Sequence, residues 1–278
     1  MRNVVRSFTR DGKRYFIPSD SRWAWRTWEE GFEANKAGRT RWLELKRRIL
    51  ARWQPCTEFK TFSETGHIAA LRPHLPHKWF AVIDLLDFYE HVTRTKVHRS
   101  LESIGFGRDE AFRLAGDSTI RQGPKVSLAR GFRQSSLFAG LVLDRSLFGS
   151  YLRRRAGQST ITIFSDDIII SSDDRDELHE EFLRLLGLLE RSNFPVHPRK
   201  TQFPQSEVQV FNIKMSHGRL RFTDERMWKF LSTAEEIFSG QQEGKVSLFE
   251  ELFGGYVTSV NVEQARLLRA SVGFEVHM

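Results

Sequence analysis

The order of apolar and polar positions along the chain predicts a mixture of short strands and helices. An apolar run at residues 79–83 ends in Asp84 and is typical of a buried strand. Two runs rich in β-branched residues at 160–172 meet at a Ser-Asp-Asp sequence, residues 165–167, which predicts a hairpin. Leucine and phenylalanine then recur at helical spacing over residues 175–191. The clearest part of the pattern is therefore a strand, a hairpin and a helix.

The rest of the pattern adds mostly helices. The expected elements are helices at 21–52, 95–116 and 135–154, a loop at 117–127, two short strands within 207–222 and helices from 224 onward. Strands and helices do not alternate regularly along the chain. The order therefore predicts an α+β fold and not a doubly wound sheet.

Length and composition narrow the class of protein. With 278 residues, the chain has the length of one large or two modest domains. It contains one cysteine, Cys56, and so cannot form an internal disulfide. Its longest apolar run, residues 137–143, is far shorter than the roughly 20 residues that span a bilayer, and the N-terminus lacks the apolar core of a signal peptide. We therefore expect a cytoplasmic protein that does not contact a membrane.

Positive charge is concentrated at the N-terminus. Residues 1–60 hold 15 of the 43 lysines and arginines but only seven of the 35 acidic residues. The same segment holds five of the seven tryptophans, which are Trp23, Trp25, Trp28, Trp42 and Trp53. Cations neutralise phosphates and aromatic rings stack on bases, so this basic, tryptophan-rich region is a candidate for RNA binding. A helix that buries its tryptophans and keeps its cations in water is an equally open alternative.

Three aspartates carry the strongest chemical signal. Asp166 and Asp167 lie between two isoleucine-rich strands, where unpaired carboxylates are costly to remove from water. Asp84 ends another apolar strand, and neighbouring strands could bring the three groups together. A divalent cation compensates such a cluster, and Mg²⁺ prefers oxygen ligands. Each feature also has a simpler interpretation, because aspartate is common in turns and at helix N-termini.

The two acidic segments resemble conserved motifs of a known enzyme family. Asp84-x-x-x-Phe88-Tyr89 resembles motif A of reverse transcriptases. Phe164-Ser165-Asp166-Asp167 resembles their motif C, which has an aromatic residue, any residue and then two aspartates. Both stand at the end of a predicted strand, as the family pattern requires.

Three further motifs occur in the family's order. His197-Pro-Arg-Lys200-Thr201 is similar to motif D, and Val208-x-Val-Phe211-Asn212 stands at the position of motif E. Between motifs A and C, four positions match the motif B pattern LPQGxxxSPxLA: Leu128, Gly131, Ser135 and Ala139. Each motif is weak alone, but the ordered set, over about residues 80–215, is specific.

Motif B departs from the family pattern and indicates a subfamily. Ala129 and Arg130 stand where the usual pattern has Pro and Gln, and Phe132 and Ser136 are unusual. This Gly-Phe-x-x-Ser form is closer to bacterial abortive-infection and defence-associated reverse transcriptases than to retroviral or intron enzymes.

The resemblance implies a right-hand polymerase with fingers, a ferredoxin-like palm and a small helical thumb. It divides the chain into a basic N-terminal region with fingers at 1–79, a palm at 80–222 with a fingers insertion near 98–127, and a thumb at 223–278. It also implies that Asp84, Asp166 and Asp167 are the catalytic carboxylates and hold two Mg²⁺ ions.

The resemblance further implies a set of substrate-binding residues. Tyr89 would be a steric gate that collides with a ribose 2′-hydroxyl, with Phe88 beside it. The other expected contacts to nucleotide or template are Gly131, Ser135, Arg130, Lys200, Lys60 and Arg72. Ordinary packing of Tyr89, a plain loop-to-helix junction at Gly131 and solvated surface cations remain open alternatives.

The implied activity is RNA-directed addition of dNTPs to a 3′-hydroxyl. We expect an RNA template, a DNA product, a dedicated noncoding RNA, a role in antiphage defence and a homo- or hetero-oligomer. One alternative is untemplated, protein-templated or protein-primed DNA synthesis on the same fold. Another is a noncatalytic RNA-binding scaffold, although an idle scaffold gains nothing from a buried acidic cluster.

Overall fold

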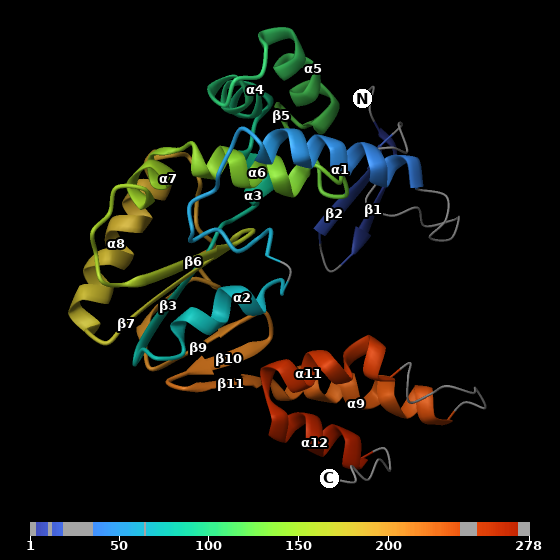
Figure 1. The fold of residues 1–278 in the computed structure, drawn as a ribbon, viewed down its shortest axis with the longest axis vertical. Coiled ribbons are helices and arrows are strands. Elements are labelled where there is room, and N and C mark those ends of the chain that lie inside the picture. Colours follow the sequence, from blue (N-terminus) through green and yellow to red (C-terminus); the bar gives the residue numbers. More distant parts are fainter. Residues whose placement is uncertain (1–3, 11–12, 19–35, 64, 240–248, 272–278) are drawn as a thin grey trace.

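The computed structural model describes residues 4–10, 13–18, 36–63, 65–239 and 249–271 (Figure 1). The helix predicted at 21–52 is confirmed for α1, Lys36–Leu50. Its expected first half, with Trp23, Trp25 and Trp28, lies outside the described residues. None of the described helices combines the length and the apolar character that a membrane span needs.

A four-stranded antiparallel sheet forms the centre of the molecule. Its order is β6 (Thr160–Phe164), β7 (Asp167–Ser172), β3 (Trp79–Asp84) and β8 (Gln202–Gln205). The predicted strand at 79–83 and the predicted hairpin at 160–172 are therefore confirmed, and they are neighbours. The turn itself is shorter than expected, because Asp167 is already the first residue of β7.

The central sheet is buried on both faces, which explains its continuous apolar runs. Ala81 and Ile83 of β3 face one core, which α8 (Arg175–Arg191) and α6 (Ser135–Asp144) also fill. Phe80 and Val82 face a second core on the opposite side, because successive side chains of a strand alternate. The predicted helix at 175–191 is confirmed in full and begins at Asp174, whose side chain accepts hydrogen bonds from two backbone N–H groups.

The second core continues into a small sheet and the C-terminal helices. The small sheet consists of β9 (Glu207–Val210), β10 (Ile213–Ser216) and β11 (Arg219–Phe222), one strand more than predicted for this segment. The helices that follow are α9 (Asp224–Ser239), the π-helical η4 (Glu250–Gly254), α11 (Gly255–Val260) and α12 (Val262–Ser271). The helical C-terminus predicted from residue 224 onward is thus confirmed for the described residues.

The elements above the central sheet correct several predictions (Figure 1). The helix predicted at 95–116 is two helices, α4 (Arg94–Ser103) and α5 (Arg108–Ser118), because Gly105 has a φ of +86° that ends the first one. The loop predicted at 117–127 is a hairpin of β4 (Thr119–Gln122) and β5 (Lys125–Leu128) that turns at Gly123. The helix predicted at 135–154 is likewise two, α6 and α7 (Leu147–Leu152), with Ser146 capping the second.

The N-terminal hairpin was not predicted. It consists of β1 (Val4–Arg10) and β2 (Lys13–Pro18), which pair antiparallel. In Figure 1 the hairpin and the C-terminal helices lie on the same side of the central sheet, one above the other. The remaining short elements are α2 (Ile68–Leu71), η3 (Arg72–His74) and α3 (Phe88–His91).

Candidate active site

The three predicted carboxylates lie at one end of the central sheet. Asp84 is the last residue of β3 and stands directly opposite Asp167, the first residue of β7. Asp166 lies in the β6–β7 turn, and its carbonyl oxygen accepts a hydrogen bond of 2.8 Å from the backbone N–H of Leu85. Directly opposed residues on antiparallel strands project to the same face. The sheet register therefore brings together acidic residues that are about 80 positions apart in the sequence.

The cluster is electrostatically strained. Burial, together with the negative charges of Asp166 and Asp84, raises the pKa of Asp167 to about 8, although Lys200 and Lys13 act in the opposite direction. Asp84 is only 8% exposed. Carboxylates that are buried close together gain stability from an added cation.

The segment after α8 positions a lysine beside Asp84. The backbone N–H of His197 donates to the Asp84 carbonyl at 2.7 Å, which fixes this segment against the end of β3. The Lys200 ammonium group lies 3.3 Å from Asp84 Oδ2 and is about half exposed. Lys200 is thus a counter-ion to Asp84, a predicted metal ligand. The resemblance to motif D predicted a lysine near the substrate site.

The residues present fit a divalent cation that also binds substrate. Within the described ranges, no group of three or more His, Cys, Asp or Glu side chains is already converged on a metal position. Mg²⁺, however, is usually held by one or two carboxylates together with substrate phosphates and water, not by a complete protein cage. Asp84 and Asp166 can supply those two carboxylates, and a bound cation would offset the burial and the negative charges that raise the pKa of Asp167.

Tyr89 and Phe88 follow Asp84 but occupy different environments. Phe88 is 2% exposed and packs in the main core against the Phe194 ring, so it supports the segment that carries Tyr89 from below. Tyr89 is only half-buried, with its ring 5.8 Å from that of Phe88. Burial and the charge of Asp166 raise the pKa of Tyr89 to about 12, so the hydroxyl stays protonated. Tyr89 is therefore the aromatic residue next to the acidic cluster, as predicted.

Motif B forms a strained turn that leads into α6. Gly131 has a φ of +101°, and a Cβ atom at this position would lie 2.4 Å from the Phe16 carbonyl oxygen. Only glycine fits such a close approach in this backbone conformation. The Ser135 hydroxyl donates to the Ala129 carbonyl at 2.7 Å and closes the turn. Ser135 is buried, so the structure gives it a role in shaping the turn.

Arg130 is directed toward acidic residues of α3. Its guanidinium group lies 3.2 Å from Glu90 and 3.4 Å from Asp87, and its side chain is 14% exposed. The sequence prediction placed Arg130 on a phosphate or an incoming nucleotide. In the structure, which holds no nucleotide, Arg130 ties motif B to residues 87–90, the segment that carries Tyr89.

A family model described as reverse transcriptase (RNA-dependent DNA polymerase) matches residues 44–231, about two thirds of the chain. The chain belongs to this family. Reverse-transcriptase domains generally use divalent metal ions such as Mg²⁺, in keeping with the acidic cluster. No curated protein sequence matches the chain.

Solved telomerase structures share the fold of this reverse-transcriptase chain. Telomerase from Candida albicans, in complex with a TWJ fragment of telomeric RNA, is 10% identical with a TM-score of 0.55 over 97% of this chain and 54% of the telomerase. Apo telomerase from Candida tropicalis, truncated from its C-terminal domain, is 9% identical with a TM-score of 0.52 over 79% and 54%. The chain thus spans about half the length of these relatives. The fold is that of a right-hand polymerase, as predicted.

Lys60 and Arg72, two of the predicted substrate contacts, lie on segments that precede β3. The segment of Lys60 runs beside β6, where the Lys60 N–H donates to the Ile163 carbonyl at 2.8 Å. Arg72 begins η3 and is exposed. In the part of the chain that the structure describes, neither side chain forms an ion pair with the three aspartates.

The N-terminal hairpin supplies cations that sequence reasoning missed. The charge of Lys13 lowers the pKa of Asp167, and Tyr15 lies close enough to Tyr89 to influence its pKa. The backbone N–H of Phe16 donates to the Arg130 carbonyl at 2.8 Å, which docks β2 on motif B. The Asp11-Gly12 pair between two alternating segments is a hairpin signal that could have revealed this element.

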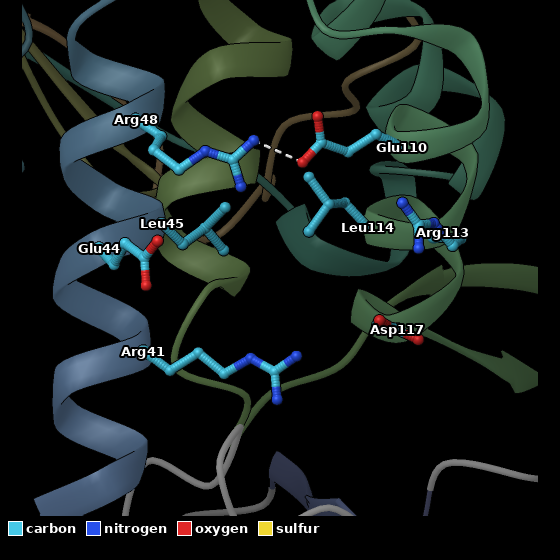
Figure 2. Close-up of a pocket in the computed structure, with 8 residues that line it drawn as sticks. All are labelled: Arg41, Glu44, Leu45, Arg48, Glu110, Arg113, Leu114 and Asp117. Atoms are coloured by element: carbon cyan, nitrogen blue, oxygen red, sulfur yellow. Dashed lines mark hydrogen bonds and ion pairs between the residues drawn. The ribbon is translucent and has the colours of Figure 1, made fainter.

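A polar cleft also lies between α1 and α5. Figure 2 shows Arg41 and Arg48 extending from α1 toward α5, where Glu110 pairs with Arg48 at 2.5 Å. The cleft has a volume of about 320 Å³. Its lining holds as many acidic residues as arginines: Arg41, Arg48, Arg113, Glu44, Glu110 and Asp117. The positive and negative charges balance one another, so we interpret these residues as a polar contact between α1 and α5 and not as an anion-binding site.

Proposed function

We propose that this chain is an RNA-directed DNA polymerase that adds dNTPs to a 3′-hydroxyl by two-metal catalysis. The observation that carries the proposal is the position of Asp84 directly opposite Asp167, with Asp166 in the adjoining turn. Membership of the reverse-transcriptase family supports the reaction class. Because the chain spans about half of its telomerase relatives, the activity, substrates and partners are all part of the proposal.

Asp84 and Asp166 would hold the two Mg²⁺ ions, and Asp167 would tune the charge of the cluster. When bound, the ions would favour the deprotonated 3′-hydroxyl and neutralise the triphosphate charge. The protein's own residues then have to position the reactants, because phosphoryl transfer requires little covalent chemistry from the enzyme. Lys200, 3.3 Å from Asp84 in the structure, would contact the triphosphate.

Tyr89 would select the sugar of the incoming nucleotide. It is half-buried beside the acidic cluster, and a ring at this position would collide with a ribose 2′-hydroxyl. Gly131 would allow the backbone to approach the nascent base pair, while Arg130 would position motif B through Asp87 and Glu90. Lys13 on the N-terminal hairpin, whose charge acts on Asp167, joins Lys60 and Arg72 as a candidate for a triphosphate contact.

We further propose that the enzyme is cytoplasmic, acts in antiphage defence with a dedicated noncoding RNA and forms oligomers. The Gly-Phe-x-x-Ser form of motif B supports the defence-associated subfamily. The exposed cations Arg47, on α1, and Arg52, just after it, support RNA binding by the N-terminal region. The domain boundaries at residues 79 and 222 remain predictions within the same proposal.

The test is primer extension on an RNA template with a DNA primer, dNTPs and Mg²⁺. We expect the wild type to extend the primer, and we expect Asp84→Asn and Asp166→Asn to reduce the rate by at least about a thousandfold. Both variants should keep the wild-type circular dichroism spectrum and RNA affinity. Asp173→Asn, at the other end of the same hairpin and 62% exposed, is the matched control.

The alternatives give different outcomes in this assay. DNA made equally well without an RNA template would favour untemplated or protein-primed synthesis. No synthesis, together with intact RNA binding, would favour a noncatalytic scaffold. Full activity of either aspartate variant would refute the site assignment.

A further inference from the structure

His67 lies where three separate segments of the chain meet. It precedes α2, and its ring contacts the rings of Phe164 at the end of β6 (6.0 Å) and Phe211 in the β9–β10 turn (5.0 Å). Its Nε2 atom lies 2.7 Å from the Tyr256 hydroxyl on α11. The His67 side chain therefore touches the catalytic hairpin, the motif E sheet and the C-terminal helices at once.

Tyr256 connects this contact to the thumb. The Tyr256 ring packs edge-on against Phe222 at the end of β11 (5.1 Å) and against Phe230 of α9 (6.2 Å). Phe222 and Phe230 are themselves buried and in contact, at 5.2 Å. A displacement of Tyr256 would therefore move α11 together with its neighbour α9.

Phe164 connects the same contact to the catalytic turn. It is two residues before Asp166, and the residue between them, Ser165, has a φ of +59°. The Ser165 backbone N–H donates to the Thr61 hydroxyl at 2.9 Å, so the turn is held from one side by residue 61 and from the other by the ring that His67 supports. A tight turn of this kind has few backbone conformations available to it.

The contact between His67 and Tyr256 is a hydrogen bond, which depends on direction as well as distance. Burial and the charge of Arg226 lower the pKa of His67, so the imidazole is neutral at neutral pH. A neutral imidazole has one donor and one acceptor nitrogen, and either can pair with a phenol hydroxyl. Aromatic contacts tolerate a range of distances, whereas a hydrogen bond fixes both distance and angle. This bond is the polar contact within an otherwise aromatic junction.

We propose that His67 is a positioning residue that couples the thumb to the catalytic hairpin. Its hydrogen bond to Tyr256 holds α11 at a fixed distance from the turn that carries Asp166. The position of the thumb on a primer–template duplex would then be set by the same side chain that supports motif C. This inference rests on the proposed function, and it concerns duplex binding and not the chemical step.

The test uses isosteric changes at both ends of the bond. Tyr256→Phe removes the hydroxyl and keeps the ring, and His67→Phe removes the nitrogens. We expect each to raise the KM for primer–template about fivefold with kcat within about twofold of wild type, and the double variant to match the single ones because both break the same bond. His67→Gln, which retains a hydrogen-bonding end group, should restore part of the affinity. Tyr151→Phe, which loses a bond to Glu181 far from the thumb, is the control.

A second readout does not depend on activity. Hydrogen–deuterium exchange of residues 255–260 should become faster in Tyr256→Phe and His67→Phe, but not in Tyr151→Phe. An unchanged KM with unchanged exchange would overturn the coupling, and so would a loss of kcat at constant KM. If the wild type makes no DNA, the proposed function fails, and the exchange experiment alone then decides whether His67 holds the thumb.

Discussion

His74 supports the β6–β7 hairpin and has no exposed surface. Its Nδ1 atom lies 2.7 Å from the Ser171 hydroxyl on β7, and its Nε2 atom lies 2.7 Å from the Thr162 hydroxyl on β6. The Thr162 hydroxyl donates to the Ala70 carbonyl and can therefore accept from Nε2–H. A single neutral side chain thus joins the two strands that carry the Asp166 turn.

The environment of His74 predicts a loss of stability in acid. Burial lowers its pKa from 6.5 to about 3, so the unfolded chain binds the proton more readily than the folded one. Stability from this group is complete above pH 6.5 and falls as the pH drops toward 3, by about 2 kcal/mol between pH 7 and 5. In the wild type, the free energy of unfolding measured with urea should fall between pH 7 and pH 5. In His74→Gln this fall should be smaller by about 2 kcal/mol, because the titrating group is gone. The exposed His179→Gln should keep the wild-type slope.

Tyr89 makes a second prediction at the scale of one residue. If its ring excludes a ribose 2′-hydroxyl, Tyr89→Ala should raise incorporation of NTPs relative to dNTPs by at least about tenfold. The measurement is kcat/KM for each nucleotide on the same primer–template. An unchanged ratio would mean that Tyr89 only packs against Phe88.

At the scale of elements, the N-terminal hairpin depends on one glycine of motif B. The Phe16 carbonyl occupies the space where a side chain at position 131 would begin. The hairpin otherwise contacts the rest of the molecule through a small cluster of Phe16, Ile120, Ala129 and Phe132. Because this cluster is separate from both large cores, the docking of β2 has little other apolar support.

Gly131→Ala should therefore release the hairpin. The added methyl group clashes with backbone and strains a φ of +101°, which we expect to cost about 1–3 kcal/mol locally. Hydrogen exchange of residues 13–18 should accelerate, and primer extension should slow as Lys13 leaves the carboxylates. Gly123→Ala is the matched control, because Gly123 also has a positive φ, of +60°, but no atom within 4 Å of an added Cβ. Equal exchange in the two variants would contradict the docking role.

The elements differ in how well the local sequence predicts them. The segment of α8 has regular leucine spacing and the capping Asp174, so both ends were predictable. The break at Gly105 was not, because a single glycine is tolerated in many helices and the packing of α4 on α5 decides the outcome.

The acidic site was predictable for a physical reason. Burying a carboxylate at the end of an apolar strand costs desolvation free energy unless other groups compensate its charge. Both Asp84 and the Asp166-Asp167 pair follow such strands. The positions of Lys60, Arg72 and Lys13 carry no such local signal. Where a surface cation lies relative to the site depends on how distant segments dock, which no spacing in the sequence records.

At the scale of the whole molecule, one end of the central sheet lies near parts from every region of the chain. Lys13 comes from the N-terminal hairpin, Tyr89 from α3 and Lys200 from the segment after α8. His67 links the β6–β7 hairpin to α11. The central claim is that this convergence exists to hold divalent cations at Asp84 and Asp166.

Mn²⁺ binding, followed by electron paramagnetic resonance, tests that claim most directly. The wild type should bind Mn²⁺ in the presence of dNTP and a primer–template that cannot be extended, and Mg²⁺ should displace it. Asp84→Asn and Asp166→Asn should lose this binding, while Asp173→Asn keeps it. Undiminished Mn²⁺ binding by Asp84→Asn and Asp166→Asn would contradict the claim.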